Sequence, residues 1–175
     1  MCAMNYATIK ICDIANGVGV RTSLFVSGCT HHCPSCFNAE AQDFQYGKPF
    51  DKKTEDFLIS ELQKSYVSGL TLLGGEPFEP ENQRALLPFV RRVRELCPGK
   101  TVWAFSGYTW EELTGVSRAR CEVTDQLLSL LNVLVDGEFV ESLKDISLRF
   151  RGSANQRIID VPASVRTGEI VLWKG

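Results

Sequence analysis

Residues 22–36 read Thr22-Ser-Leu-Phe-Val-Ser27-Gly-Cys29-Thr-His-His-Cys33-Pro-Ser-Cys36, an apolar run that leads directly into three cysteines. The run is short and rich in β-branched and aromatic residues, which predicts a strand buried on both faces. The cysteines then follow the carboxyl end of that strand. Three thiols this close in sequence do not form a disulfide framework, but they suit one compact metal centre.

The spacing of the cysteines, C-x3-C-x2-C, narrows the choice of metal. Thiolates select zinc, cuprous copper and iron–sulfur clusters. A [4Fe–4S] cluster usually takes four cysteines, whereas this run offers three, so one iron would remain free to bind a substrate. The alternative is structural zinc, for which His31 or His32 would complete a Cys3His ligand set.

The composition bounds the class of protein. At 175 residues, with 44% hydrophobic and 23% charged residues, we expect one globular domain over residues 1–175. A net charge of −2 gives no electrostatic footprint for nucleic acid. No apolar run approaches the ~20 residues of a membrane helix, and the start of the chain does not resemble a signal peptide. Seven cysteines without a secretion signal predict reduced thiols and a cytoplasmic location.

Strand-like and helix-like segments alternate along the chain, which argues for βα units on a mostly parallel sheet. The chain is too short for a closed (βα)8 barrel of ~250 residues, so we expect an α/β fold with an open, partial barrel. The remaining expected strands are 6–12, 69–73, 101–105, 132–136, 157–161 and 169–173, with a turn of helix and a loop between 138 and 152. Expected helices begin near residues 51, 109 and 125, and a further helix is delayed by Pro77 and Pro80. The helix that opens at Thr109-Trp-Glu-Glu112 carries a capping box.

Two of these helices show an apolar stripe. Leu58, Leu62 and Tyr66 recur at every fourth position after an N-cap at Asp51. In the next helix, Pro88 either kinks the helix or begins its regular part. The apolar residues of that second stripe are Phe89, Val90, Val93 and Leu96.

The motifs on and around the cysteine run resemble those of one family. The C-x3-C-x2-C spacing resembles the cluster motif of the radical S-adenosylmethionine enzymes. Further motifs narrow the resemblance to the glycyl-radical activases of anaerobic ribonucleotide reductases, and the similarity spans residues 13–160. These motifs are Asn16-Gly-Val-Gly-Val-Arg21, Gly74-Gly-Glu-Pro77, Ser106-Gly-Tyr108, Val135-Asp-Gly137 and Arg151-Gly-Ser-Ala-Asn-Gln156.

This resemblance implies a partial barrel of the radical S-adenosylmethionine type and a [4Fe–4S] cluster bound by Cys29, Cys33 and Cys36. The fourth iron would be chelated by S-adenosylmethionine, which the cluster cleaves after reduction by a low-potential donor such as a flavodoxin. The resulting 5′-deoxyadenosyl radical would remove a hydrogen atom from a glycine of the large anaerobic ribonucleotide reductase subunit. The cofactors carry this chemistry, so no catalytic side chain is expected.

The resemblance and the strand ends together suggest the cofactor-binding residues. Gly74 and Gly75 let the backbone approach a ligand closely, and the resemblance assigns this turn to the methionine end of the cofactor. Glu76 either faces the ammonium group of the cofactor or is an exposed turn residue. The family often has an aromatic residue just before the third cysteine, where this chain has Ser35. Phe37 is then the nearest aromatic substitute for stacking on the adenine.

Ser106, Asp136 and Asn155 complete the expected cofactor site, together with Cys36 and with Ser35, whose backbone would still contact the adenine. Asp136 ends a strand, where α/β proteins usually bind ligands. A turn carboxylate is the alternative for Asp136, and a loop-stabilising role is the alternative for Asn155. The remaining cysteines are scattered singly and are expected to be core or surface thiols; they are Cys2, Cys12, Cys97 and Cys121.

Other functions compete with the activase. A small radical S-adenosylmethionine enzyme acting on a free metabolite, similar to 7-carboxy-7-deazaguanine synthase, would share the same cluster chemistry. A ferredoxin-like electron carrier or a zinc-binding adaptor would share only the cysteines. Cleavage of S-adenosylmethionine distinguishes an enzyme from a carrier, and metal and sulfide analysis distinguishes iron–sulfur from zinc.

Overall fold

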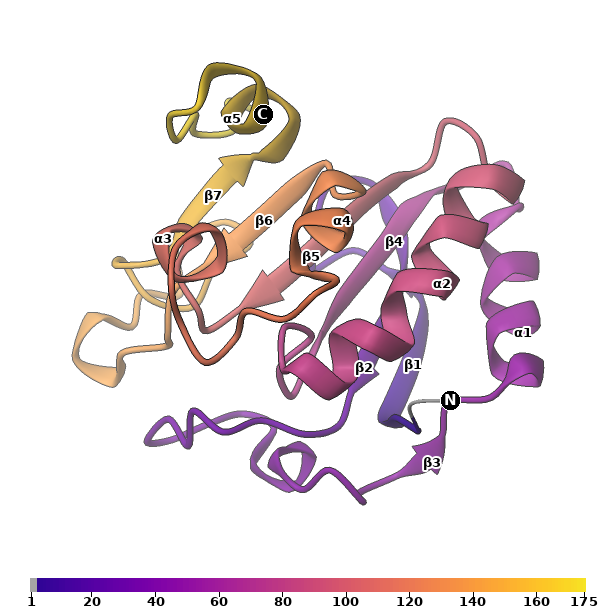
Figure 1. Ribbon diagram of the computed structural model, residues 1–175, viewed down its shortest axis with the longest axis horizontal. Coiled ribbons are helices and arrows are strands. Elements are labelled where there is room, and N and C mark those ends of the chain that lie inside the picture. Colours follow the sequence, from indigo (N-terminus) through magenta and orange to yellow (C-terminus); the bar gives the residue numbers. More distant parts are fainter. Residues whose placement is uncertain (1–2) are drawn as a thin grey trace.

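The computed structural model describes residues 3–175, which form one curved sheet with helices packed against it (Figure 1). Within these residues the sheet has seven strands in the order β3-β1-β2-β4-β5-β6-β7. The strands are β1 (Asn5–Asp13), β2 (Val20–Val26), β3 (Lys48–Pro49), β4 (Val67–Gly74), β5 (Thr101–Ser106), β6 (Val133–Asp136) and β7 (Arg157–Asp160).

The four central strands β2, β4, β5 and β6 are parallel, so their carboxyl ends meet at one edge of the sheet. The predicted α/β fold with an open, mostly parallel sheet is confirmed. The outer strands β1, β3 and β7 are antiparallel, which the alternation of segments did not predict. Residues 14–19 between β1 and β2 are too few for a parallel crossover. Between β6 and β7 the chain forms only a 3-10 turn, η2 (Glu141–Leu143).

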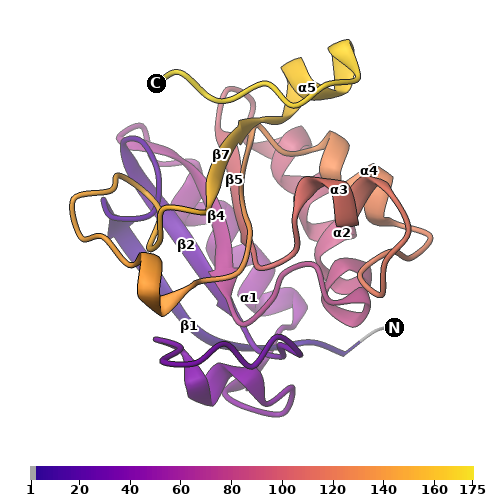
Figure 2. The ribbon, with the colours of Figure 1, turned by 90° about the vertical axis from the view of Figure 1, so that its left-hand side faces the viewer.

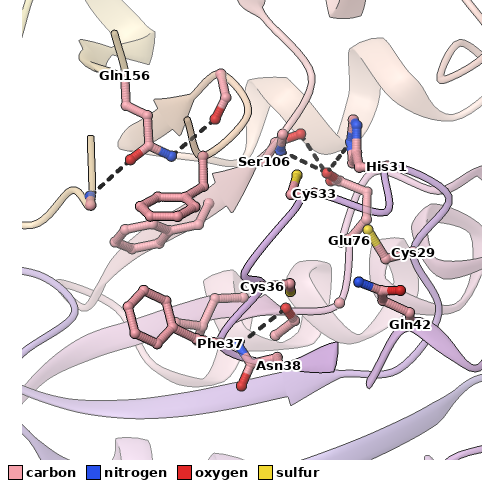
Figure 3. Close-up of a pocket in the computed structure, with 18 residues that line it drawn as sticks. Cys29, His31, Cys33, Cys36, Phe37, Asn38, Gln42, Glu76, Ser106 and Gln156 are labelled. Atoms are coloured by element: carbon pink, nitrogen blue, oxygen red, sulfur yellow. Dashed lines mark hydrogen bonds and ion pairs between the residues drawn. The ribbon is translucent and has the colours of Figure 1, made fainter. Parts of the chain in front are cut away.

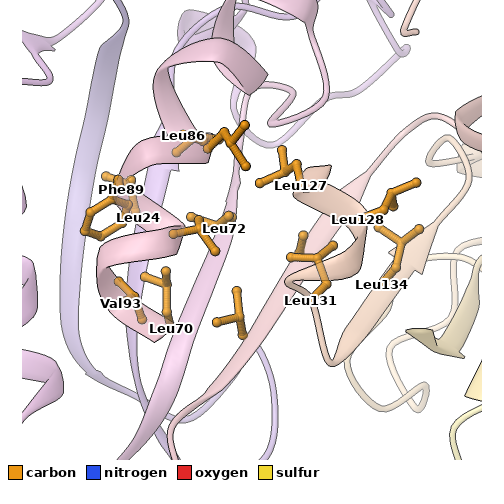
Figure 4. Packing of buried hydrophobic residues seen from close by; sticks show 14 of the residues in the cluster. Leu24, Leu70, Leu72, Leu86, Phe89, Val93, Leu127, Leu128, Leu131 and Leu134 are labelled. Carbon is orange, nitrogen blue, oxygen red and sulfur yellow. The ribbon is translucent and has the colours of Figure 1, made fainter. Parts of the chain in front are cut away.

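Three helices pack against one face of the sheet and build the main core (Figures 1 and 4). They are α1 (Lys52–Leu62), α2 (Pro80–Leu96) and α4 (Thr124–Ser129), and the short helix α3 (Trp110–Thr114) adds Leu113 to the same core. Their apolar side chains meet alternate residues of the parallel strands, because side chains on a strand point to opposite faces in turn. Buried residues of this core include Leu24, Leu70, Leu72, Leu86, Phe89, Val93, Leu127, Leu128, Leu131 and Leu134.

The other face of β5 and β6 carries a smaller apolar cluster. Trp103 and Val135 are buried there, and Phe150 and Trp173 pack against them. The rings of Phe150 and Trp173 lie edge-on to Trp103, with centroids 5.4 and 5.2 Å away. The loop before β7 and the end of the chain therefore cover this side of the sheet.

Local sequence signals predicted the helix starts well. The Asp51 side chain accepts a hydrogen bond from the backbone N–H of Thr54 at the start of α1. Thr109 and Glu112 form the predicted capping box at α3 (Trp110–Thr114).

No helix in residues 3–175 is both long enough and apolar enough to span a membrane.

The apolar stripes are only partly as predicted. Helix α1 ends at Leu62, and Tyr66 lies beyond it with its side chain exposed. Helix α2 already begins at Pro80, and Pro88 lies inside it on the exposed side. Burial of the residues on both sides of Pro88 stabilises the helix enough to offset the ~3 kcal/mol cost of an internal proline. Leu96, the last residue of the second stripe, is exposed.

The predicted strand at 169–173 is wrong, and the predicted connector before it is a helix, α5 (Val161–Thr167). The Asp160 side chain caps this helix by accepting from the backbone N–H of Ala163, and Gly168 ends it with a φ of 75°. These are ordinary helix start and stop signals. Residues after the helix then make only an isolated bridge between Leu172 and Ile159.

Candidate metal and cofactor site

A pocket lies at the edge where the four parallel strands end (Figure 3). The cysteine loop follows β2, the Gly-Gly turn follows β4, and the Ser106 and Gly137 segments follow β5 and β6. Most of the residues predicted from the sequence meet here: Cys29, Cys33, Cys36, Phe37, Gly74, Gly75, Glu76 and Ser106. Ser35, Asp136 and Asn155 do not line this pocket.

The three cysteines are free and partly exposed around one cavity, as the ligands of a cluster must be. Burial raises the pKa of the Cys29 thiol to about 12, and the charges of Glu76 and Glu79 act in the same direction. Burial also raises the pKa of Cys33. A thiolate at these positions therefore needs a cation beside it, which a bound cluster would supply.

The zinc alternative needs a histidine beside the three cysteines. Within residues 3–175, no three His, Cys, Asp or Glu side chains converge on a position for one metal ion, and this holds for Cys29, Cys33 and Cys36 as well. His32 pairs with the Gln42 side chain, Nδ1 to Oε1, at 2.9 Å. His31 pairs with two carboxylates, as described below. Three of the remaining cysteines do not line the pocket: Cys12, which is exposed, Cys97, which is buried, and Cys121, which is partly buried. Cys2 lies outside the described residues.

The Gly-Gly turn and the base of the cysteine loop are joined by backbone hydrogen bonds. Gly75 donates to the carbonyl of Val26 at 2.7 Å, and Glu76 donates to the carbonyl of Gly28 at 2.8 Å. A Cβ on Gly75 would lie 2.6 Å from the Gly28 oxygen and 2.8 Å from the Ala41 oxygen. Glycine is therefore required at 75 because the chain itself packs there, before any cofactor is considered.

Glu76 is the centre of the hydrogen bonding in the pocket wall, and its side chain is only 1% exposed. Its Oε1 accepts from the Phe78 backbone and from the Ser106 hydroxyl, both at 2.8 Å. Its Oε2 accepts from the Gly107 backbone at 2.7 Å and pairs with His31 Nε2 at 2.9 Å. The exposed-turn alternative for Glu76 is wrong. The carboxylate joins the cysteine loop to the ends of β4 and β5.

Glu76→Gln is expected to destabilise the protein by at least about 2 kcal/mol, because an amide nitrogen cannot accept and would leave buried donors unsatisfied. Urea unfolding measures the loss, and the iron content after anaerobic reconstitution measures the order of the cysteine loop. Glu81→Gln, at an exposed position in the first turn of α2, is the matched control and should stay within about 0.5 kcal/mol. Equal stability of the two variants would contradict a central role for Glu76.

His31 bridges two acidic residues from different strand ends. Its Nε2 lies 2.9 Å from Glu76 and its Nδ1 lies 2.6 Å from Glu138. Burial alone would lower the pKa of His31, but the hydrogen bonds and charges of the two carboxylates outweigh it and raise the pKa. A doubly protonated imidazole donates to both partners. This role was not predicted, because Glu138 is remote in sequence.

Tyr108 supports the cysteine loop from behind. Its ring packs on His31 with centroids 4.3 Å apart, and only 2% of the residue is exposed. Its hydroxyl accepts from Arg118 Nε at 3.0 Å. The adjacent carboxylate of Glu79 accepts from both the backbone N–H and the hydroxyl of Thr30, at 2.8 and 2.7 Å. Tyr108 is therefore a buried residue behind the cysteine loop and does not itself line the pocket.

Asp136 and Asn155 lie in a polar groove beside the pocket. The Asp136 carboxylate accepts from the Trp110 backbone at 2.7 Å and from Arg157 Nε at 3.0 Å. Asn155 donates from its side chain to the Glu138 carbonyl at 2.8 Å. Both side chains therefore hold strand ends and loops together in this structure. These structural roles are the alternatives that the sequence left open for Asp136 and Asn155.

Arg157 also forms an ion pair with Glu111, and this contact depends on pH. Hydrogen bonds from Arg157 lower the pKa of Glu111 from 4.5 to about 2. Because the folded-state pKa is depressed, this contact stabilises the fold above pH 4.5 and is lost as the pH falls towards 2. Glu111→Gln should therefore reduce the loss of stability between about pH 5 and about pH 2, measured by urea unfolding. The change will be small, under ~1 kcal/mol, because Glu111 is 61% exposed and screened by salt. A wild-type pH profile in the variant would contradict the assignment.

Three amide side chains complete the pocket and were not predicted: Asn38, Gln42 and Gln156. Asn38 donates to the Gly74 carbonyl at 3.4 Å. Gln156 accepts from Gly152 at 2.8 Å and donates to the Gly137 carbonyl at 2.9 Å. Gln156 belongs to a motif that the sequence singled out, but its role depends on a loop that folds back on itself. Asn38 and Gln42 carry no sequence signal.

Comparisons with known proteins agree with this site. The family described as "4Fe-4S single cluster domain" matches residues 15–159. The fold and the cysteine loop therefore define an iron–sulfur protein of the single-cluster class.

Curated relatives identify the particular family. The chain is 44% identical over 155 residues to the anaerobic ribonucleoside-triphosphate reductase-activating protein of Escherichia coli K12, covering 87% of this chain and 96% of the relative. Identity to the protein of the same name from Pasteurella multocida is 45% over 157 residues, covering 89% and 96%. The enterobacteria phage T4 protein is 37% identical over 155 residues, covering 89% and 93%. The chain belongs to the family of anaerobic ribonucleoside-triphosphate reductase-activating proteins, which confirms the resemblance stated from its motifs.

Proposed function

We propose that this protein activates an anaerobic ribonucleotide reductase by generating a glycyl radical in its large subunit. The observation that carries the proposal is the three-cysteine loop, which lines one pocket together with the Gly-Gly turn at the carboxyl ends of four parallel strands. The names of the relatives supply the reductase as the target of activation.

The fold is consistent with a partial barrel of the radical S-adenosylmethionine type. The sheet is curved and open (Figure 2). The pocket lies at the carboxyl ends of the parallel strands, where α/β proteins bind ligands. In this proposal Cys29, Cys33 and Cys36 hold a [4Fe–4S] cluster and leave one iron without a protein ligand. The cluster, when bound and reduced, supplies the electron that cleaves S-adenosylmethionine.

The residues of this chain bind and orient the cofactor. The Gly74 carbonyl, positioned by Asn38, is available to accept from the ammonium group of S-adenosylmethionine. Phe37 lines the same cavity and offers an aromatic face for the adenine. The carboxylate of Glu76 is already fully hydrogen-bonded, so its part is to hold the loop and the turn in register. Asp136 and Asn155 would act from the neighbouring groove, by fixing the loop after β6.

The competing functions are less well supported. An electron carrier would not need the cavity beside the cysteines, which is lined by glycines and aromatic rings. A metabolite enzyme would share the cavity, but the relatives at 37–45% identity are named for activation of a reductase. We therefore propose a protein substrate. The family resemblance alone adds a low-potential electron donor such as a flavodoxin to this proposal.

The test is anaerobic reconstitution followed by reduction and addition of S-adenosylmethionine, with and without the large reductase subunit. We expect 5′-deoxyadenosine in both mixtures, and a glycyl-radical paramagnetic resonance signal only when the reductase subunit is present. Iron and sulfide near four of each per chain would support the cluster. Zinc in place of iron, or no nucleoside product, would exclude the proposal. Product formation without any radical in the reductase would favour the metabolite enzyme.

A further inference from the structure

The loop between β6 and β7 lies beside the cysteine loop, and we refer to residues 138–152 as the β6–β7 loop (Figures 2 and 3). The ring of Phe139 packs against the ring of Phe37 with centroids 5.7 Å apart. The ammonium group of Lys144 lies 5.4 Å from the centroid of the Phe37 ring. Phe37 and Phe139 both line the pocket, so the two loops together form one side of its mouth.

The β6–β7 loop holds its shape through its own hydrogen bonds. Leu143 accepts from the Ala154 backbone at 2.8 Å, and Gly152 accepts from the Asp145 backbone at 3.2 Å. The Gln156 side chain closes the base of the loop, because it accepts a hydrogen bond from the Gly152 backbone and donates one to the Gly137 carbonyl. These hydrogen bonds hold the backbone of the loop in one conformation, which lowers the entropy cost of ordering the loop when a partner binds.

Three apolar side chains on this pair of loops are exposed. Phe37 is 76% exposed, Leu143 is 44% exposed and Ile146 is 95% exposed. Lys144, which contacts the Phe37 ring, lies between the two exposed residues of the loop. Leu143 directly precedes it, and Ile146 follows it by two residues. We call Phe37, Leu143 and Ile146 the mouth patch. It begins at a residue that lines the pocket and continues outward along the β6–β7 loop.

We propose that the mouth patch is the docking surface for the glycine-bearing subunit of the reductase, an inference that rests on the proposed function. An alkyl radical must be formed within contact of its target hydrogen atom, because loose placement forfeits most of the advantage of orientation. The target glycine therefore has to enter the mouth that Phe37 and Phe139 flank. A protein that fills this mouth also covers the apolar side chains next to it. Ile146 does not line the pocket, so a small metabolite held there would leave it uncovered.

The test compares Ile146→Glu with Ile14→Glu. Ile14 is 74% exposed and precedes β2, so it lies at the opposite end of the sheet from the pocket. Both variants should fold like the wild type in urea unfolding. The affinity of the cluster-loaded protein for the purified large reductase subunit is measured by calorimetry. Cleavage of S-adenosylmethionine without the reductase is measured in parallel. We expect Ile146→Glu to weaken binding by about tenfold or more and to lower the radical yield. Cleavage alone should stay unchanged.

The outcomes separate this inference from the proposed function. Wild-type affinity in Ile146→Glu and in a second variant, Leu143→Glu, would overturn the docking surface while the wild-type protein still formed the radical. If Ile14→Glu weakened binding to the reductase subunit as much as Ile146→Glu, the docking surface would also be overturned. The loss of affinity would then come from the added negative charge and not from its position. Failure of the wild-type protein to form the radical would instead remove the proposed function and this inference with it.

Discussion

Replacing Cys29, Cys33 or Cys36 by alanine is expected to abolish glycyl-radical formation. Each thiol lines the pocket, and a cluster bound by three cysteines has no spare protein ligand to replace a lost one. The visible absorbance of the iron–sulfur cluster should be lost or greatly reduced in each variant after anaerobic reconstitution. The stability of the apoprotein should change little, because all three side chains are partly exposed.

Cys12→Ala is the matched control for this series, since Cys12 is an exposed free cysteine on β1 and outside the pocket. It should load iron and sulfide like the wild type and activate the reductase equally well. Full cluster absorbance in any one of the three pocket variants would remove that cysteine from the ligand set. If Cys12→Ala also lost the cluster, then Cys29, Cys33 and Cys36 would not be its only cysteine ligands.

Arg21→Met is expected to lower the free energy of unfolding by about 1–3 kcal/mol for each buried acceptor that it leaves without a donor. Arg21 is fully buried at the start of β2. All five of its N–H groups donate to neutral oxygens, among them the Thr71 hydroxyl at 2.7 Å and the Leu70 carbonyl at 2.7 Å. Its guanidinium also lies 5.4 Å from the Trp103 ring centroid. Methionine keeps much of the volume but leaves these acceptors without their donors.

Urea unfolding measures the effect of Arg21→Met, and Arg166→Met at an exposed position of α5 serves as the control. Burial lowers the pKa of Arg21 to about 10, so it remains charged at neutral pH. Arg21→Lys keeps the charge but has three donors in place of five, so an intermediate loss is expected. Stability within about 0.5 kcal/mol of the wild type in Arg21→Met would show that the packing of Trp103, not the hydrogen bonds, stabilises this end of the sheet.

The motif Asn16-Gly-Val-Gly-Val-Arg21 illustrates the limit of a family resemblance. The motif was recognised from the sequence, but its physical role was not. A Cβ on Gly17 would lie 2.6 Å from Arg21 Cδ, so the glycine makes room for the buried side chain. Burial of an arginine without a carboxylate partner in hydrogen-bonding contact depends on oxygens from β4 and β5, and no local pattern predicts that.

The sequence by itself determined the features that depend on neighbouring residues. The continuous apolar run at 22–27 indicated the buried strand β2, and Asp51 and Thr109 indicated helix starts. The cysteine spacing indicated the candidate metal site. These signals are local, because caps, strand patterns and ligand spacing act over a few residues. The signals for α5 were equally local, so its assignment as a connector was an error of interpretation.

Only the tertiary structure decided which side chains face the cavity and which hold it together. Glu76 and His31 could be placed near the cysteines from the sequence, but their mutual pairing and the contact with Glu138 could not. The antiparallel direction of β7 and the position of Phe139 against Phe37 likewise depend on how distant segments meet. Such contacts are set by the joint packing of the whole sheet, in which each hydrogen bond forms only after strands remote in sequence have come together.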